Sequence, residues 1–231
     1  MESASILEGV WQIPSMGFSN AYLAQIDPNT FLLVDTGTSS GSAKILKYLE
    51  STGRSPNKIS EIILTHADGD HSGSAASMKK ATGAKLAAHE KDAPRVSGQI
   101  KKIKESSGLG NLLMAIFGIF NKVERVQPDV ILNDGDTIGP FSVIYTPGHT
   151  DGSICIYKPR QVLFSGDTIL TDRSGKLRVP GNFLNRDSAQ LKKSVEKLSK
   201  LDFAVLLPGH GRPITENASA KLREFVAQGF E

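Results

Sequence analysis

Short apolar runs separated by Gly, Pro, Asn and Asp recur along the whole chain. Runs of this length, rich in Val, Ile, Leu and Phe and bounded by turn-forming residues, predict buried β-strands. The predicted strands are Val10–Ile13, Ala21–Ile26, Phe31–Val34, Ile59–Leu64, Lys85–His89, Val130–Leu132, Phe141–Tyr145, Ser153–Tyr157, Gln161–Phe164 and Phe203–Leu207.

Longer segments between these runs show the spacing of amphipathic helices. For example, Leu191, Val195 and Leu198 recur every three or four residues, and the lysines between them predict a solvated face. Strand blocks interleaved with such helices predict an α/β (α+β) chain, in which two mixed β-sheets pack face to face under outer helices. The predicted helices are Ser42–Ser51, Gly73–Thr82, Ser188–Leu201 and Ala218–Gln228.

The length suits a single domain over residues 1–231, because two-sheet folds often contain 200–250 residues. Hydrophobic residues make up 39% of the chain, which is enough for one substantial core. The halves, roughly 1–125 and 126–231, have similar orders of elements but no clear sequence repeat.

The segment 94–127 departs from this pattern. A cluster of lysines precedes the stretch 109–120, which is apolar nearly all round and must therefore be covered. We predict an apolar helical insert at about 94–127, which acts as a lid or makes a homodimer contact. Attachment to a membrane surface is the weaker alternative, because the basic and apolar parts follow one another instead of sharing one helix.

Charge and cysteine content exclude several classes of function. The formal net charge is only +3 and the basic residues are spread along the chain, which argues against a nucleic-acid partner. No run approaches the roughly 18 apolar residues of a membrane span. With no secretory signal in the first residues, we expect no stable membrane insertion and a cytoplasmic location. The single Cys155 is predicted to be a buried strand residue.

The densest group of potential metal ligands directly follows the apolar residues 62–64. His66, Asp68, Asp70 and His71 fall within six residues. Imidazole and carboxylate groups without a thiolate suit Zn, Fe or Mn. For an isolated His-Asp pair, a polar loop in which Asp70 or Ser72 caps the following helix would be the preferred interpretation.

The rest of the chain favours the metal interpretation. Of its five histidines, four follow strand-like runs that break at Gly or Pro, as His149 and His210 do in two Pro-Gly-His turns. Asp167 follows another such run in Ser-Gly-Asp. A neighbouring glycine allows the backbone to turn sharply and approach closely. We therefore predict one metal centre formed by several loops. His89 lacks such a turn and is predicted to end a strand with a hydrogen-bonded ring.

These motifs, in this order, resemble the metallo-β-lactamase superfamily of metal-dependent hydrolases over about residues 9–211. The resemblance implies an αββα sandwich with two divalent metal ions at one edge, zinc first and iron or manganese as alternatives. It also implies that Asp35 orients ligands from outside the centre. Carried over by position, His66, Asp68 and His149 would hold one ion, Asp70, His71 and His210 the other, and Asp167 would bridge both.

Asp68 stands where the family usually has a second His. An Asp oxygen lies as far from Cβ as the imidazole Nδ1 through which that His would bind, so Asp68 can also reach a metal ion. The extra carboxylate cancels the one positive charge left by two divalent ions, a bridging hydroxide, Asp70 and Asp167. A less positive centre acidifies its water less, and an oxygen ligand moves metal preference toward Fe or Mn. The alternative is that Asp68 points away from the centre, so that the first metal site binds its ion weakly or is empty.

The implied activity is hydrolysis of an acyl bond (ester, thioester or lactone) in a small-molecule substrate. A metal ion lowers the pKa of bound water from 15.7 to about 7, which provides hydroxide at neutral pH. Asp70 would orient this nucleophile and pass its proton to the leaving group. The carboxylate of Asp68 supports an alternative function, that of an iron-dependent oxidoreductase of the flavodiiron or persulfide-dioxygenase type. A low-activity metal-binding protein is a further alternative, and the missing secretory signal disfavours β-lactam hydrolysis.

Overall fold

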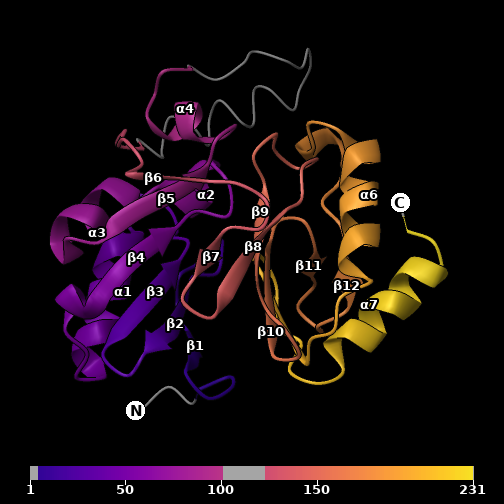
Figure 1. Ribbon diagram of the computed structural model, residues 1–231, viewed down its shortest axis with the longest axis horizontal. Helices are drawn as coiled ribbons and strands as arrows, with labels where there is room; N and C mark the ends of the chain where they lie inside the picture. Colours follow the sequence, from indigo (N-terminus) through magenta and orange to yellow (C-terminus); the bar gives the residue numbers. More distant parts are fainter. Residues whose placement is uncertain (1–4, 101–122, 231) are drawn as a thin grey trace.

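The computed structural model describes residues 5–100 and 123–230, and its first sheet comes from the N-terminal part of the chain (Figure 1). Strands β1 to β3 pair antiparallel, and β3 to β6 pair in parallel. In spatial order the strands are β1 (Val10–Gln12), β2 (Tyr22–Asp27), β3 (Thr30–Val34), β4 (Ile59–Ile63), β5 (Lys85–His89) and β6 (Val130–Leu132).

The second sheet comes from the C-terminal part and is also mixed. Its order is β13 (Val205–Pro208), β10 (Val162–Gly166), β9 (Ile154–Lys158), β8 (Phe141–Tyr145) and β7 (Thr137–Ile138). Only β10 and β13 pair in parallel. A separate hairpin joins β11 (Leu170–Thr171) to β12 (Leu177–Arg178). The sequence pattern missed β7, β11 and β12 because two-residue strands leave no recognisable apolar run.

Helices cover the outer faces of both sheets, which gives the predicted αββα sandwich (Figure 1). Helices α1 and α3 lie against the first sheet, and α6 and α7 against the second. Shorter helices lie in the connecting loops. The bounds are α1 (Gly41–Ser51), α2 (Gly69–Ser72), α3 (Ala75–Thr82), α4 (Ala93–Val96), α6 (Ser188–Leu198), α7 (Ala218–Ala227) and the 3-10 helices η1 (Pro56–Lys58) and η2 (Asn182–Leu184).

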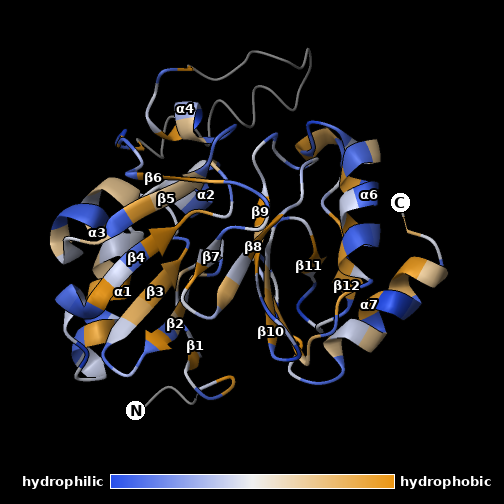
Figure 2. Cartoon of the chain, viewed as in Figure 1, coloured by the Kyte–Doolittle hydropathy of each residue, from blue (hydrophilic) through white to orange (hydrophobic). Residues whose placement is uncertain are grey.

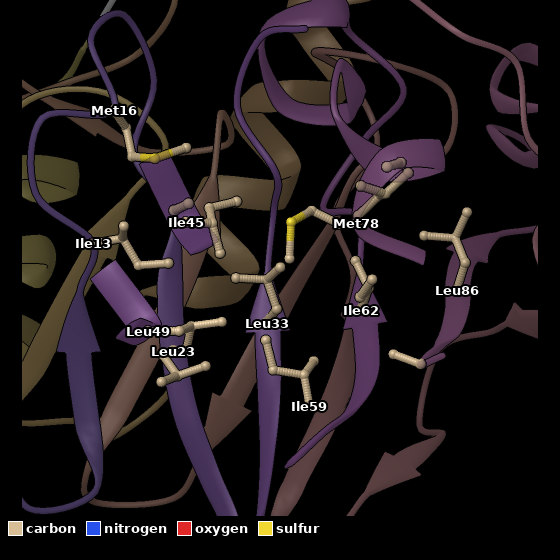
Figure 3. Close-up of a cluster of buried hydrophobic side chains, with 14 of the residues drawn as sticks. Ile13, Met16, Leu23, Leu33, Ile45, Leu49, Ile59, Ile62, Met78 and Leu86 are labelled. Carbon is tan, nitrogen blue, oxygen red and sulfur yellow. The ribbon is translucent and has the colours of Figure 1, made fainter. Parts of the chain in front are cut away.

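The alternation of side chains along each strand produces three apolar layers. On β3, Leu32 and Val34 face the opposite sheet, whereas Leu33 faces the helices. Figure 3 shows this outer cluster, in which Ile45 of α1 and Met78 of α3 lie close to Leu33. The strands of both sheets are coloured largely as hydrophobic in Figure 2. Burial on both faces explains why the strands are continuous apolar runs in the sequence.

Two sequence-based expectations concern the middle of the chain. The two halves described from the sequence, roughly 1–125 and 126–231, divide a few residues before the sheets do, because β6 pairs with β5 and extends the first sheet to Leu132. Most of the predicted insert at 94–127, including the stretch 109–120, lies outside the described residues, so its homodimer contact stays a prediction. Within the described part of the chain, no helix has the length and apolarity needed to cross a bilayer.

Candidate metal centre

The predicted ligand residues all follow the carboxyl ends of strands. His66 follows β4, His149 follows β8, Asp167 follows β10 and His210 follows β13. Strands β8, β10 and β13 run in the same direction within their sheet, so the loops after them meet at one edge. The fold thus brings together residues that are far apart in the sequence.

Glycines beside two of these residues are required by close backbone approach. A Cβ atom at Gly209 would collide with the Oδ1 atom of Asp167. Gly148 has φ +136°, and a Cβ atom there would collide with the backbone of Leu191 on α6. L-residues rarely adopt the φ of Gly148, and a side chain at Gly209 would clash, so each Pro-Gly-His turn needs its glycine to place the histidine.

The structure brings all seven predicted ligand residues together. Their candidate ligand atoms form overlapping groups in which the atoms lie within 4.8 Å of one another. Two of these groups are the triads implied by the family resemblance, and the third contains Asp167. The groups are His66, Asp68 and His149; Asp70, His71 and His210; and His66, His71 and Asp167.

Asp167 lies between the two triads. Its Oδ1 atom is 3.4 Å from Nε2 of His71, and its Oδ2 atom is 3.2 Å from Nε2 of His210. The same Oδ2 atom is 3.7 Å from Nε2 of His149 in the other triad. One carboxylate therefore faces members of both triads, which is the geometry expected of a bridging ligand.

Asp68 points into the centre. Its Oδ2 atom lies 3.2 Å from Nε2 of His149 and 3.8 Å from Nε2 of His66. Its Oδ1 atom accepts a hydrogen bond of 2.8 Å from Nη2 of Arg95. The structure thus differs from the alternative in which this carboxylate turns away from the first triad.

All four imidazoles in the centre are held through Nδ1. A donated Nδ1 proton fixes the tautomer in which Nε2 keeps a free lone pair, as a metal ligand requires. The partners are Thr65 Oγ1 at 3.0 Å for His66, Asp35 Oδ2 at 2.8 Å for His71, Asn185 Oδ1 at 3.3 Å for His149 and the Phe18 carbonyl at 2.8 Å for His210.

Asp35 organises two of these contacts from outside the centre. It is buried and has φ +61°, a conformation unusual for a non-glycine residue. Its Oδ1 atom accepts the Thr65 backbone N–H, and its Oδ2 atom accepts both the Thr65 hydroxyl and Nδ1 of His71. This arrangement matches the orienting role that the family resemblance implies for Asp35.

Buried polar atoms that lack a hydrogen-bond partner test whether the centre suits a metal ion. Among the described residues, these atoms are Nε2 of His66, Nε2 of His149 and Oδ1 of Asp167. An unsatisfied buried polar group costs about 1–3 kcal/mol, so three around one centre indicate a missing electron-pair acceptor. Nitrogen and oxygen donors without thiolate suit a divalent cation. The clusters are consistent with a dinuclear metal site.

Electrostatics give the imidazoles of the centre different proton affinities. Burial alone would lower the pKa of His71, but the carboxylates of Asp167 and Asp35 raise it to about 9. Burial also opposes protonation of His210, whose hydrogen bonds to Asp167 and Asp70 raise its pKa to about 11. Burial and the nearby His71 lower the pKa of His66 to about 4. Without a metal ion, protons on His71 and His210 therefore balance the carboxylates.

Metal binding should consequently release protons. A pH of 7 lies below the pKa values of His71 and His210, about 9 and 11, so both imidazoles are protonated. Metal binding needs neutral imidazoles. We expect about two protons to leave these rings when the second triad fills, so its affinity for metal should fall as the pH falls. Titrating Zn²⁺ into metal-free protein in buffers of different ionisation enthalpy measures this release. His210→Ala should release about one proton fewer, and a heat independent of the buffer would contradict the prediction.

Comparison with known proteins identifies the family. Residues 15–210 match the model of the "Metallo-beta-lactamase superfamily". The chain belongs to this superfamily. The match includes every candidate ligand, and it confirms both the family that the motifs predicted and the expectation of a metallo-hydrolase.

Curated proteins and solved structures both include chains similar to this one. "Probable metallo-hydrolase YflN" of Bacillus subtilis (strain 168) is 26% identical, over 90% of this chain and 86% of that protein. A hydroxyacylglutathione hydrolase of Polaromonas sp. is 28% identical, over 66% of this chain and 49% of that protein. The structure of BJP-1, a subclass B3 metallo-β-lactamase of Bradyrhizobium japonicum, has a TM-score of 0.73 at 21% identity and covers 99% of this chain and 90% of that one. It shows the shared fold.

Several residues that support the centre were not found from the sequence. Arg95 and Asn185 contact ligand residues, and the buried Asp92 accepts hydrogen bonds from Ala67 N–H and Thr150 Oγ1, joining two ligand loops. No motif marks them; only the excess charge of Asp68 hinted at a compensating cation. By contrast, His89 ends β5 as expected.

Proposed function

We propose that this protein is a metal-dependent hydrolase that cleaves an acyl bond, in an ester, thioester or lactone, of a small-molecule substrate. The observation that carries the proposal is the pair of His/Asp triads joined by Asp167, with buried lone pairs facing the centre. The proposed ligands of the first ion are His66, Asp68 and His149, those of the second are Asp70, His71 and His210, and Asp167 serves both.

The chain's residues arrange the reaction around those ions. Bound divalent ions supply a water nucleophile of lowered pKa and polarise the substrate carbonyl. Asp35 and the other Nδ1 partners keep each Nε2 lone pair directed at the centre. The charge of two divalent ions is offset by Asp68, Asp70 and Asp167.

Asp70 is the candidate proton carrier. Its side chain is 27% exposed, compared with 9% for Asp167, so it lies on the more open side of the centre. Its Oδ2 atom is 3.2 Å from Nε2 of His210. Burial opposes ionisation, but His71 and His210 lower the pKa of Asp70 below its ordinary value. The ionised carboxylate can therefore accept a proton and donate it to the leaving group.

Exposed apolar residues near the centre support an acyl substrate with an apolar part. Phe18 is 66% exposed and packs edge-on against the ring of His210, with centroids 5.8 Å apart. Phe183 is 86% exposed in η2, which leads directly to Asn185 beside His149. Ligand sites are lined mainly by hydrophobic and aromatic side chains, so these two rings can contact the apolar part of an acyl substrate. The similarity to a hydroxyacylglutathione hydrolase favours a thioester.

A metal-dependence experiment tests the proposal. Chelator-treated protein should lose turnover of an acyl thioester, an ester or a lactone, and two equivalents of Zn²⁺, Mn²⁺ or Fe²⁺ per chain should restore it. Each substrate is assayed with each metal, because the oxygen ligand Asp68 can favour Fe or Mn. Full activity in protein shown by elemental analysis to be metal-free would refute the proposal.

One observation favours a second candidate, an iron-dependent oxidoreductase. His66, His149 and Asp68 form a two-histidine, one-carboxylate set of the kind found at non-haem iron. An electronic spectrum after anaerobic iron loading, followed by exposure to oxygen, distinguishes the two candidates. Hydrolysis that proceeds equally well with zinc and without oxygen supports the first.

A further inference from the structure

Arg95 contacts the side of Asp68 that faces away from the proposed metal position. Its Nη2 atom donates a 2.8 Å hydrogen bond to Oδ1 of Asp68, while Oδ2 of the same carboxylate lies 3.2 Å from Nε2 of His149. The two oxygens of Asp68 therefore have different partners. One is held by a guanidinium group, and the other faces the first triad.

Arg95 is itself held in place. Its side chain is only 18% exposed, and its Nη1 atom lies 4.0 Å from Oδ1 of the buried Asp92. Asp92 in turn accepts the backbone N–H of Ala67, next to Asp68. These contacts distinguish Arg95 from a solvated surface cation.

The charges of Arg95 and Asp68 complement each other. An Asp in place of a neutral imidazole adds one negative charge to the first triad, and the guanidinium adds one positive charge beside it. The pair as a whole is neutral, as the usual histidine would be. A planar guanidinium also binds one edge of a carboxylate in a fixed direction, which an ammonium does not.

We propose that Arg95 is a positioning residue of the metal centre, which directs one oxygen of Asp68 to the first metal ion and compensates the charge that Asp68 introduces. This inference rests on the proposed function. Without Arg95, the partly exposed Asp68 can rotate toward solvent. Loss of such an outer partner lowers metal affinity roughly 10- to 100-fold.

Substitutions in two backgrounds test the inference through metal binding. In the parent chain, Arg95→Gln should lower the affinity for the first ion roughly 10- to 100-fold, measured by titrating Zn²⁺ into metal-free protein. Asp68→His alone leaves the positive charge of Arg95 beside the ion without the carboxylate that balanced it. This variant should therefore also bind the first ion weakly. Adding Arg95→Gln to Asp68→His removes the repulsion between the guanidinium and the ion, so the double variant should bind the first ion more tightly than Asp68→His alone. Opposite effects of Arg95→Gln in the two backgrounds support the inference, and effects in the same direction overturn it.

A control variant separates positioning from general damage to α4. Arg125→Gln removes the 2.8 Å hydrogen bond that Arg125 donates to the backbone carbonyl of Arg95, but leaves the contact between the Arg95 guanidinium and Asp68. It should bind both ions as the parent does, and a loss equal to that of Arg95→Gln would overturn the inference. Far-ultraviolet circular dichroism and the midpoint of thermal unfolding check that each variant folds.

The parent titration distinguishes failure of the inference from failure of the proposed function. A parent that binds no ion, or that stays active without metal, contradicts the proposed function itself. A parent that binds two ions, together with an Arg95→Gln variant that binds them equally well, contradicts only the role of Arg95.

Discussion

Asp167→Ala should remove both metal ions and abolish hydrolysis. The two oxygens of Asp167 face nitrogen atoms of both triads, so a single substitution removes a ligand from each position. The Nε2 atoms of His71 and His210 lie 3.2 Å apart, and Asp167 is the most buried carboxylate facing them. The loss in affinity should exceed the roughly 10- to 100-fold caused by losing an outer partner. Elemental analysis and kcat/KM for an acyl thioester measure both effects.

A matched control makes this result interpretable. Glu196→Ala removes an exposed carboxylate on α6 that is not a candidate ligand, and should keep two ions and parental turnover. Asp167→Asn keeps the side-chain shape but not the charge and should also lose both ions. An Asp167→Ala protein that still binds two ions would show that the triads bind metal independently of this carboxylate.

Asp70→Asn should lower turnover by about 100- to 10,000-fold, because general acid–base catalysis typically contributes that much. The first triad should keep its ion. The amide retains the shape of the carboxylate beside His210 but cannot accept the transferred proton. The second ion should bind more weakly, since the amide carries no charge. Zinc stoichiometry and the pH dependence of kcat separate the loss of the proton carrier from the loss of the ion.

Ser19→Ala provides the comparison for Asp70. The Ser19 hydroxyl donates to the backbone carbonyl of Asp70, so this variant loosens the loop without altering the carboxylate. Its effect on kcat should be much smaller than that of Asp70→Asn. An Asp70→Asn protein with parental turnover at saturating zinc would exclude Asp70 as the proton carrier.

Much of the centre could be predicted because its signals are local. The apolar run before His66 and the Pro-Gly-His turns at His149 and His210 can each be read within a few residues. Strand ends that lie at one edge then bring these loops together. The supporting contacts carry no such signal. Asn185 is 36 positions from His149 and Arg95 is 27 from Asp68, and neither pair belongs to a motif.

The sequence by itself determined the longer strands, the outer helices and the types of donor atom, because apolar runs, glycine turns and ligand chemistry are properties of short segments. Only the tertiary structure decided where the Asp68 carboxylate points, which atom fixes each imidazole and which cation accompanies the extra negative charge. Each of these depends on contacts between loops that approach one another only after the two sheets have packed. The meeting of His71 and His210, 139 positions apart, is the extreme case.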